Sequence, residues 1–295
     1  MYNEKTFFKK LGVFFSFGFI PLLAFSLVVM IPFLFGLFVT FTNWTGTQSK
    51  VMFTGIKNYT TAFTDPQFWA SMGITFKYVL WTLVLTNLVA FALALLVTSG
   101  FKGQNGFRAA FFTPNLIGGV ILGFIWLFIF SRVIVYLGKT FNIGLLASSW
   151  IGDPDKALWA LIIVGVWQMS GYMMLIYIAG LLAIPGSVME AARIDGATNW
   201  QVLIKIKIPM MVPSFTISLF LTLQKAFMTF DTNLSLTHGG PYQSTEFAAM
   251  HIYNEAFKFR NYGTGQAKAF LFFAVVAAIA LTQVMVLKRK EVDAL

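Results

Sequence analysis

The chain interrupts an otherwise apolar sequence with the stretch SVMEAARIDGATNWQVLIKIKIP, residues 187–209, whose charged and polar side chains favour water. Long apolar runs, residues 157–183 and 212–230, lie on either side of it. Over all 295 residues, 58% are apolar and 11% are charged, and the mean hydropathy is +0.76. This balance is far from that of a soluble globular domain, so we expect lipid to surround most of the chain.

A membrane-spanning helix needs about 20 predominantly apolar residues, because the hydrocarbon core is about 30 Å thick and each residue adds about 1.5 Å. Six stretches meet this requirement: residues 13–41, 71–98, 109–130, 157–183, 212–230 and 265–287. Their apolar runs are continuous, which favours helices over the alternating strands of a barrel. We therefore predict an all-α integral membrane protein with one transmembrane domain over residues 1–295. Residues 187–209 form the loop between the fourth and fifth helices.

An even number of spans places both termini on one side of the membrane. That side carries eleven of the 21 Lys and Arg residues and the other side carries seven, with three inside the spans. The positive-inside rule then predicts cytoplasmic termini and a cytoplasmic loop at 187–209. Topology also accounts for the net charge of +10, so no nucleic-acid partner is expected. The absence of cysteine excludes thiolate chemistry, and with two histidines we expect no metal site.

The loop has the signals of two short helices. Ser187 and Glu190 have the spacing of a capping box, and Gly196 suits the left-handed residue that ends a helix. Thr198 is a candidate N-cap for a second helix that runs to Pro209. The pattern fits two interpretations equally: an amphipathic pair that rests on the membrane surface, or a docking element for a cytoplasmic partner.

The segment EAARIDGATNWQVLIKIKIPMMVP (190–213) resembles the EAA loop of binding-protein-dependent ABC importer permeases, in the form found in carbohydrate importers. The resemblance extends along the chain to four further segments: FTGIKNY (53–59), GFRAAFFTPNL (106–116), LTHGGPYQSTE (236–246) and YGTGQAKAF (262–270). It is closest to the larger, maltose-type membrane subunit, which pairs with a second and different permease.

This resemblance implies that residues 187–209 are the coupling helices that sit in a cleft of the ATPase subunit. The residues expected to make that contact are Glu190, Ala191, Ala192, Asp195, Gly196 and Ala197. No second acidic residue or histidine accompanies Glu190 with a plausible geometry, so we interpret it as a cap and docking contact and not as a catalytic acid. The resemblance implies a transport subunit and no enzyme.

The sequence contains no phosphate-binding GxxxxGK[ST] loop, so ATP and Mg²⁺ are expected on separate subunits and no cofactor in this chain. The resemblance implies a second permease in a heterodimer, two cytoplasmic ATPase subunits and an extracytoplasmic sugar-binding protein. The expected location is the bacterial cytoplasmic membrane, with multiple spans in contact with lipid.

Polar residues inside apolar spans are costly and therefore informative. Lys225 lies within the fifth predicted span, and Asp231, six residues later, is too far along a helix to share its face. Lys225 either snorkels or pairs with another helix, or it donates hydrogen bonds in a translocation cavity. Aligned on Pro114, Trp167 and Pro185, and Gly239 to Pro241, six positions match those where the maltose-type permease contacts sugar. They are Asn115, Gly119, Gln168, Tyr172, Thr222 and Lys225.

The expected substrate is a di- or oligosaccharide, and the intramembrane lysine raises the hypothesis that it is anionic. Lys77 and Lys268, near the ends of their spans, are expected to snorkel. Trp44, Trp150 and Tyr242, in external loops, either anchor at the lipid interface or contact the binding protein.

Three other functions remain open: an ion-coupled secondary transporter, an ABC importer of a non-sugar solute, and an intramembrane enzyme. The sequence has no convincing inverted repeat for the first and few acids or histidines in its spans for the last.

Overall fold

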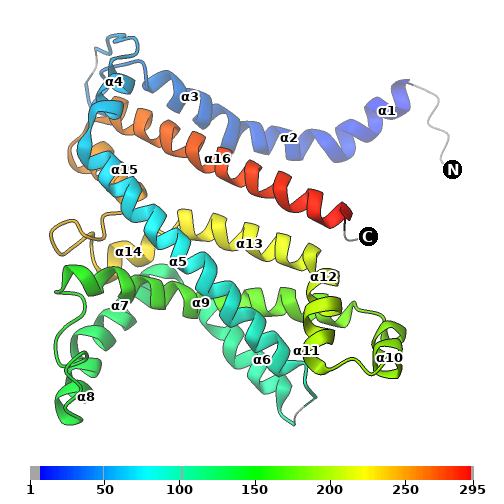
Figure 1. Ribbon diagram of the computed structural model, residues 1–295. Coiled ribbons are helices and arrows are strands. Elements are labelled where there is room, and N and C mark those ends of the chain that lie inside the picture. The colour runs from blue at the N-terminus through cyan, green and yellow to red at the C-terminus, as the bar shows by residue number, and fades with distance from the viewer. Residues whose placement is uncertain (1–6, 49, 101, 294–295) are drawn as a thin grey trace. The chain divides into compact units, whose positions relative to one another are not determined.

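The computed structural model describes residues 7–48, 50–100 and 102–293, and within these ranges every regular element is a helix (Figure 1). Five helices are long and apolar enough to cross a membrane, and they cover Lys10–Val39, Pro66–Val97, Gly119–Thr140, Pro154–Leu182 and Tyr262–Leu287. Two further helical segments, Asn199–Met210 and Val212–Phe227, meet at a bend of 68°. If this bent pair is one span, the described residues contain six. The prediction of an all-helical membrane protein is therefore confirmed, with five to six spans.

The chain divides into two compact units. The first comprises residues 1–65 and 252–271, and the second comprises residues 66–251 and 272–295.

The first unit begins with one long helical segment that contains two π-helical turns. Its elements are α1 (Phe7–Val13), η1 (Phe14–Gly18), α2 (Phe19–Phe25), η2 (Ser26–Met30) and α3 (Ile31–Val39). Each π turn ends shortly before a proline, Pro21 or Pro32. Proline lacks an N–H and its ring crowds the carbonyl four residues earlier, so the local widening accommodates both residues without ending the helix.

The other elements of this unit are α4 (Lys57–Thr64), η6 (Asn254–Lys258) and the beginning of α16 (Tyr262–Asp293). Asn58 donates to the carbonyl oxygens of Thr40 and Thr42, at 2.8 and 2.7 Å, and accepts from the Thr264 hydroxyl at 3.1 Å. A side chain on Gly263 would overlap Asn58 and the Thr42 carbonyl. Two of the quoted segments, 53–59 and 262–270, are thus joined by hydrogen bonds and close packing.

Lys268 differs from its expected snorkelling position. Its side chain is 1% exposed, and its Nζ lies 2.6 Å from Asp65 Oδ2 and 2.8 Å from Glu255 Oε2. Asn261 donates to the other oxygen of Glu255 at 2.8 Å. The two carboxylates, at hydrogen-bond distance, offset the desolvation of the ammonium group, which allows the lysine to point inward. We call Lys268, Asp65 and Glu255 the ion cluster.

The second unit is built on α5 (Pro66–Val97), α9 (Pro154–Leu182) and α13 (Val212–Phe227), which pack against one another. α9 begins where Asp153 accepts a hydrogen bond from the Asp155 N–H at 3.0 Å. Lys156 also binds Asp153, and its hydrogen bond lowers the pKa of that carboxyl. The apolar core includes Ala90 and Ala94 of α5 and Met173 and Met174 of α9, all fully buried.

The third predicted span, residues 109–130, is not one helix. It contains the end of α6 (Gln104–Phe112), a 3-10 turn η3 (Thr113–Leu116) and the beginning of α7 (Gly119–Phe128). Helical structure then continues through η4 (Ile129–Val133) and α8 (Ile134–Thr140), beyond the predicted end. Pro114 causes the break, because it removes an N–H and disfavours helix in the residue before it.

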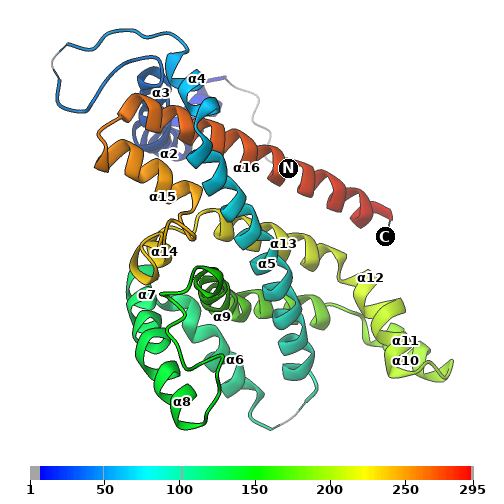
Figure 2. The same ribbon diagram turned by 60° about the vertical axis from the view of Figure 1, so that its left-hand side comes forward.

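The loop between α9 and α13 contains α10 (Gly186–Ile194), α11 (Asn199–Val202), η5 (Leu203–Lys207) and α12 (Ile208–Met210). Figures 1 and 2 show α10 and α11 together at one end of the second unit, with α12 leading into α13. After α13 the chain forms α14 (Asp231–Leu236) and α15 (Ala248–Tyr253). α13 has 16 residues and ends at Phe227, three residues before the predicted end of the fifth span.

Candidate functional site

Two interruptions of the helices meet at one pocket in the second unit. The break between α6 and α7 contributes Asn115 and Gly119, and the segment between α13 and α14 contributes Met228 to Thr232. The pocket has a volume of about 400 Å³, within the range of small-molecule sites. Non-helical backbone in a membrane protein is tolerated where it lines a cavity or is buried in protein.

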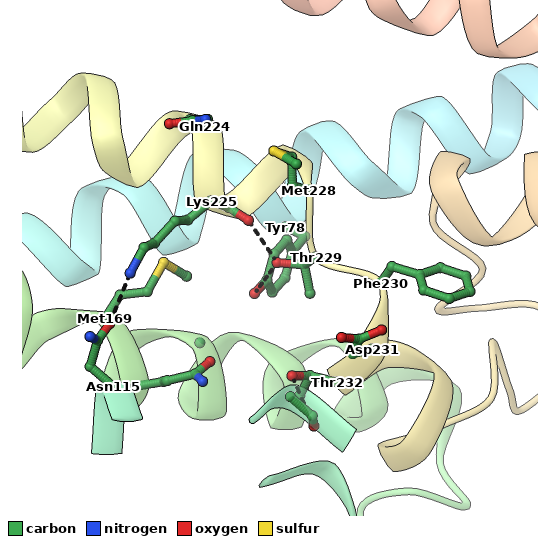
Figure 3. A pocket seen from close by; sticks show the side chains of 13 residues that line it. Tyr78, Asn115, Met169, Gln224, Lys225, Met228, Thr229, Phe230, Asp231 and Thr232 are labelled. Carbon is green, nitrogen blue, oxygen red and sulfur yellow. Dashed lines mark hydrogen bonds between the residues drawn. The ribbon is translucent and has the colours of Figure 1, made fainter. Parts of the chain in front are cut away.

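Thirteen residues line this pocket, and Figure 3 shows their side chains. They are Tyr78, Asn115, Gly119, Gly165, Gln168, Met169, Gln224, Lys225, Met228, Thr229, Phe230, Asp231 and Thr232. The lining is rich in amides and hydroxyls, which both donate and accept hydrogen bonds, and it includes one cation and one carboxylate.

Lys225 lies in the last turn of α13 and points across the pocket toward η3 (Figure 3). Its Nζ donates to Asn115 Oδ1 at 2.8 Å and lies 4.8 Å from the centre of the Tyr172 ring. Lys225 therefore pairs with another helical element, which was part of one interpretation, and it also lines a pocket; its role as a donor in a translocation cavity stays a prediction. Tyr172 contacts the lysine but does not line the pocket itself.

Gln168 joins α9 to the interrupted helix, because its Nε2 donates to the Ile117 carbonyl at 3.0 Å. That carbonyl lies in the break before α7 and has no helical N–H to accept from. Gly119, the first residue of α7, lets the chain approach closely, since a Cβ there would lie 2.8 Å from Asp231 Cβ. Both residues therefore shape the pocket wall as well as line it.

Thr222 lies outside the pocket. It is fully buried and belongs to a polar cluster that links α5, α9 and α13. Asn87 Oδ1 accepts from Tyr177 and Ser218, both at 2.6 Å, and Asn87 Nδ2 donates to Thr222 at 3.3 Å. Five of the six residues expected at the sugar site thus lie at or against the pocket, and Thr222 holds helices together.

Several lining residues were not predicted from the sequence, among them Tyr78, Gln224, Thr229 and Asp231. Helical spacing does not relate Asp231 to Lys225, because α13 ends at Phe227. Gln224, a polar residue beside Lys225 in an apolar span, carried a signal that could have identified it.

The loop at residues 187–209 has the two predicted helices, but one predicted cap is wrong. α10 begins at Gly186 with Pro185 in the N-cap position, and no side chain caps it. Pro185 has extended backbone angles that turn the chain into the helix, so Ser187 is displaced into the first turn and forms no capping box with Glu190. The second helix begins as predicted, since Thr198 and Gln201 form a capping box.

Gly196 ends the first helix in the left-handed conformation, with φ of 74°. The Ala197 N–H donates to the Ala192 carbonyl at 2.9 Å, which closes the turn. Of the residues expected to contact an ATPase subunit, Ala192 is buried, Ala197 is half-buried and the other four, Glu190, Ala191, Asp195 and Gly196, are exposed. Ile194 and Trp200, which are 85% and 68% exposed, add an apolar surface beyond the residues predicted to dock.

The three aromatic residues of the loops predicted to be external differ in their surroundings. Trp44 packs on Tyr262, with ring centres 5.4 Å apart, and Trp150 packs on Phe130 and donates to the Leu145 carbonyl. Tyr242 is 93% exposed. Both tryptophans therefore have partners within their own unit, and Tyr242 is the residue of the three that is open to an external contact.

Comparison with known proteins places these features in one family. Residues 87–290 match the family described as binding-protein-dependent transport system inner membrane component. The chain is 42% identical to the probable starch degradation products transport system permease protein AmyD of Thermoanaerobacterium thermosulfurigenes, over 99% of this chain and 100% of the relative. It is 31% identical to the multiple sugar-binding transport system permease protein MsmF of Streptococcus mutans serotype c, over 94% and 96% of the two chains.

The fold is shared with a solved bacterial ABC transporter involved in the import of the acidic polysaccharide alginate. The TM-score is 0.83 at 21% sequence identity, and the match covers 95% of this chain and 96% of the other. A second structure of a bacterial alginate transporter, in complex with a periplasmic protein that holds an alginate pentasaccharide, matches with a TM-score of 0.80.

Proposed function

Since the chain belongs to the family of binding-protein-dependent transport system inner membrane components, we propose that it forms half of the transmembrane pathway of an ATP-driven oligosaccharide importer. The observation that carries the proposal is the convergence of two helix interruptions on one polar pocket. Sugar hydroxyls require both donors and acceptors, and the amides of Asn115, Gln168 and Gln224 offer both. The names of the 42% and 31% identical relatives, which refer to starch degradation products and multiple sugars, support a carbohydrate substrate.

The pathway operates by alternating access in this proposal, with the pocket open to one side of the membrane at a time. A second, homologous permease supplies the other half of the cavity wall, and an extracytoplasmic sugar-binding protein delivers the substrate. Two cytoplasmic ATPase subunits bind ATP and Mg²⁺, since this chain has no phosphate-binding loop.

Residues 187–209 transmit closure of the ATPase subunits to the spans. Three features support this role: both short helices have defined ends, at Gly196 and Thr198; Ile194 and Trp200 present apolar surface to a partner; and α12 leads directly into α13, which carries Lys225. A displacement of the loop therefore acts on the helix that carries a pocket residue.

The test is ATP-dependent uptake in vesicles that hold this chain with its co-purifying permease, ATPases and binding protein. We expect uptake of short α-1,4-linked glucose oligosaccharides, and loss of most of it in Asn115→Leu, which removes the partner of Lys225. The matched control Asn254→Leu changes an asparagine outside the pocket and should retain uptake. Uptake of an amino acid or an ion, with no sugar carried, would replace the sugar assignment with another solute.

A separate variant tests the coupling loop. Ile194→Asp places a charge on the exposed apolar surface, and we expect ATPase subunits to dissociate from the complex on a sizing column. Ile143→Asp makes the same change at another exposed isoleucine, which is outside the coupling loop, and should leave the complex intact. Retention of the ATPases by the Ile194 variant would move the docking contact elsewhere.

A further inference from the structure

The pocket contains two opposite charges that do not neutralise each other directly. Lys225 enters from α13, and Asp231 is the first residue of α14. Figure 3 shows the lysine side chain pointing away from Asp231, toward Asn115. No ion pair joins the two side chains among the residues that the structure describes.

Lys225 is satisfied by neutral groups. Its ammonium group donates to an amide oxygen of Asn115 and lies over the ring of Tyr172, at the distances given above. Neither partner carries a charge, so these two contacts provide no counter-charge for the ammonium group. An ammonium group has three donors, and one that is not used by Asn115 is free for a ligand.

Asp231 is held in place by packing. Its Cβ lies against the backbone position of Gly119, where a larger residue would collide, and its backbone carbonyl accepts from Ser235 at 2.8 Å. The carboxylate is exposed to the pocket and makes no hydrogen bond to another side chain in the described part of the chain. An ionised carboxylate only accepts hydrogen bonds, and it repels an anion.

These two charges favour one class of sugar. A neutral sugar satisfies both at once, because each hydroxyl can accept from Lys225 or donate to Asp231. A sugar carboxylate gains from Lys225, but Asp231 repels it and the lining as a whole has no net charge with which to compensate its desolvation. With Lys225 alone the preference would be reversed, as in the hypothesis of an anionic substrate.

We propose that Asp231 is a specificity-determining residue, whose carboxylate offsets Lys225 and makes the pocket select neutral over acidic oligosaccharides. This inference rests on the proposed function, since it assumes that the pocket holds the carried sugar. It assigns to Asp231 a role in rejecting the wrong substrate, which is separate from the role of the amides in binding the right one.

The experiment measures binding to the purified transporter complex without its binding protein, so that the binding protein's own selectivity does not enter. The complex is placed in lipid nanodiscs, and ligand binding is followed by saturation-transfer NMR, which detects weak ligands. The two probes are an α-1,4-linked glucose trisaccharide and the same trisaccharide with one hydroxymethyl group oxidised to a carboxylate. They differ in charge and hardly in shape.

Wild-type complex should bind the neutral trisaccharide more tightly than the acidic one. Asp231→Asn should shift the ratio of the two affinities toward the acidic probe by about tenfold or more, the effect of ~1.4 kcal/mol. Asp231→Glu should retain the wild-type preference. Asp155→Asn, which removes an exposed carboxylate that does not line the pocket, should leave the ratio unchanged.

A second measurement follows the same ratio as the salt concentration rises. Salt screens the attraction by Lys225 as well as the repulsion by Asp231, so the two effects oppose each other in wild type, whereas in Asp231→Asn the attraction alone is screened and the acidic probe should lose affinity relative to the neutral one. A residue that only stabilised the fold would not change the ratio in either measurement.

The outcomes separate the inference from the function on which it rests. If the neutral trisaccharide binds and the ratio is the same in Asp231→Asn as in wild type, the role of Asp231 is refuted and the sugar pocket stands. If neither trisaccharide binds the wild-type complex, the sugar assignment is refuted, and this inference with it.

Discussion

Replacement of Lys268 by methionine tests how much the ion cluster stabilises the first unit. The substitution removes a fully buried cation that lies 2.6 and 2.8 Å from two carboxylate oxygens. Loss of one partner from a buried ion pair costs about 3–5 kcal/mol, because the remaining charge is left buried without compensation. Asp65 keeps 22% of its side-chain exposure and Glu255 14%, and Asn261 still donates to Glu255. We therefore expect the lower end, about 3 kcal/mol.

The absence of cysteine from the chain provides the assay. Ala62, fully buried in α4, is replaced by cysteine, and the rate at which a thiol reagent labels it reports how often the first unit opens. A loss of about 3 kcal/mol should speed labelling roughly a hundredfold, since each 1.4 kcal/mol is a factor of ten. Lys57→Met, an exposed lysine in the same unit, should change the rate by about twofold at most, because surface substitutions stay within about 0.5 kcal/mol.

A triple variant separates charge from packing. Lys268→Met combined with Asp65→Asn and Glu255→Gln removes the charges together and should recover most of the stability, because neutral replacement of a whole buried network is often harmless. If the triple variant is labelled as fast as the single one, the loss comes from packing. The electrostatic reasoning is then refuted.

Three further predictions concern the second unit. Gly171→Val should prevent α6 from packing on α9, because a Cβ at that position would overlap the Phe111 carbonyl, and we expect the variant to aggregate on a sizing column. The control Gly73→Ala, which adds a methyl group in open space on α5, should be neutral or stabilising. Asn87→Ala leaves buried hydroxyls without a partner, so thermal unfolding followed by tryptophan fluorescence should show a loss of about 1–3 kcal/mol. Thr198→Ala removes the capping box and about 1 kcal/mol from the second short helix, so ATP hydrolysis per sugar carried should rise while pocket affinity is unchanged.

The helical architecture was predictable because its signal is local. A run of about 20 apolar residues predicts a span without knowledge of what packs against it, and four of the six predicted runs lie largely within long single helices of the structure. The break at Pro114 was visible as a proline in an apolar run. The end of the helix after this break was not predictable. Arg132 and Lys139 are charged and therefore favoured a loop after residue 130, but helical structure continues through both of them, from α7 to α8.

Features that depend on distant residues were less accessible. Lys268 bonds to Asp65, which is 203 positions away in the sequence, and to Glu255, which is 13 positions away. No helical periodicity links positions so far apart. Thr222 and Lys225 share a face by spacing, yet Thr222 bonds to Asn87 of α5 in a buried cluster, whereas the longer side chain of Lys225 reaches Asn115 across the pocket. The capping box at Ser187 was wrong because Pro185 begins the helix two residues earlier than the motif requires.

The ion cluster also has a consequence for how the chain is made. Its three residues are synthesised in the order Asp65, Glu255, Lys268, so both carboxylates leave the ribosome before the lysine that lies between them. A lysine in a nascent membrane helix opposes its transfer into lipid, and the two counter-charges of this one are already synthesised when Lys268 leaves the ribosome. The order of the three residues along the chain thus gives the lysine its partners at the time that its helix forms.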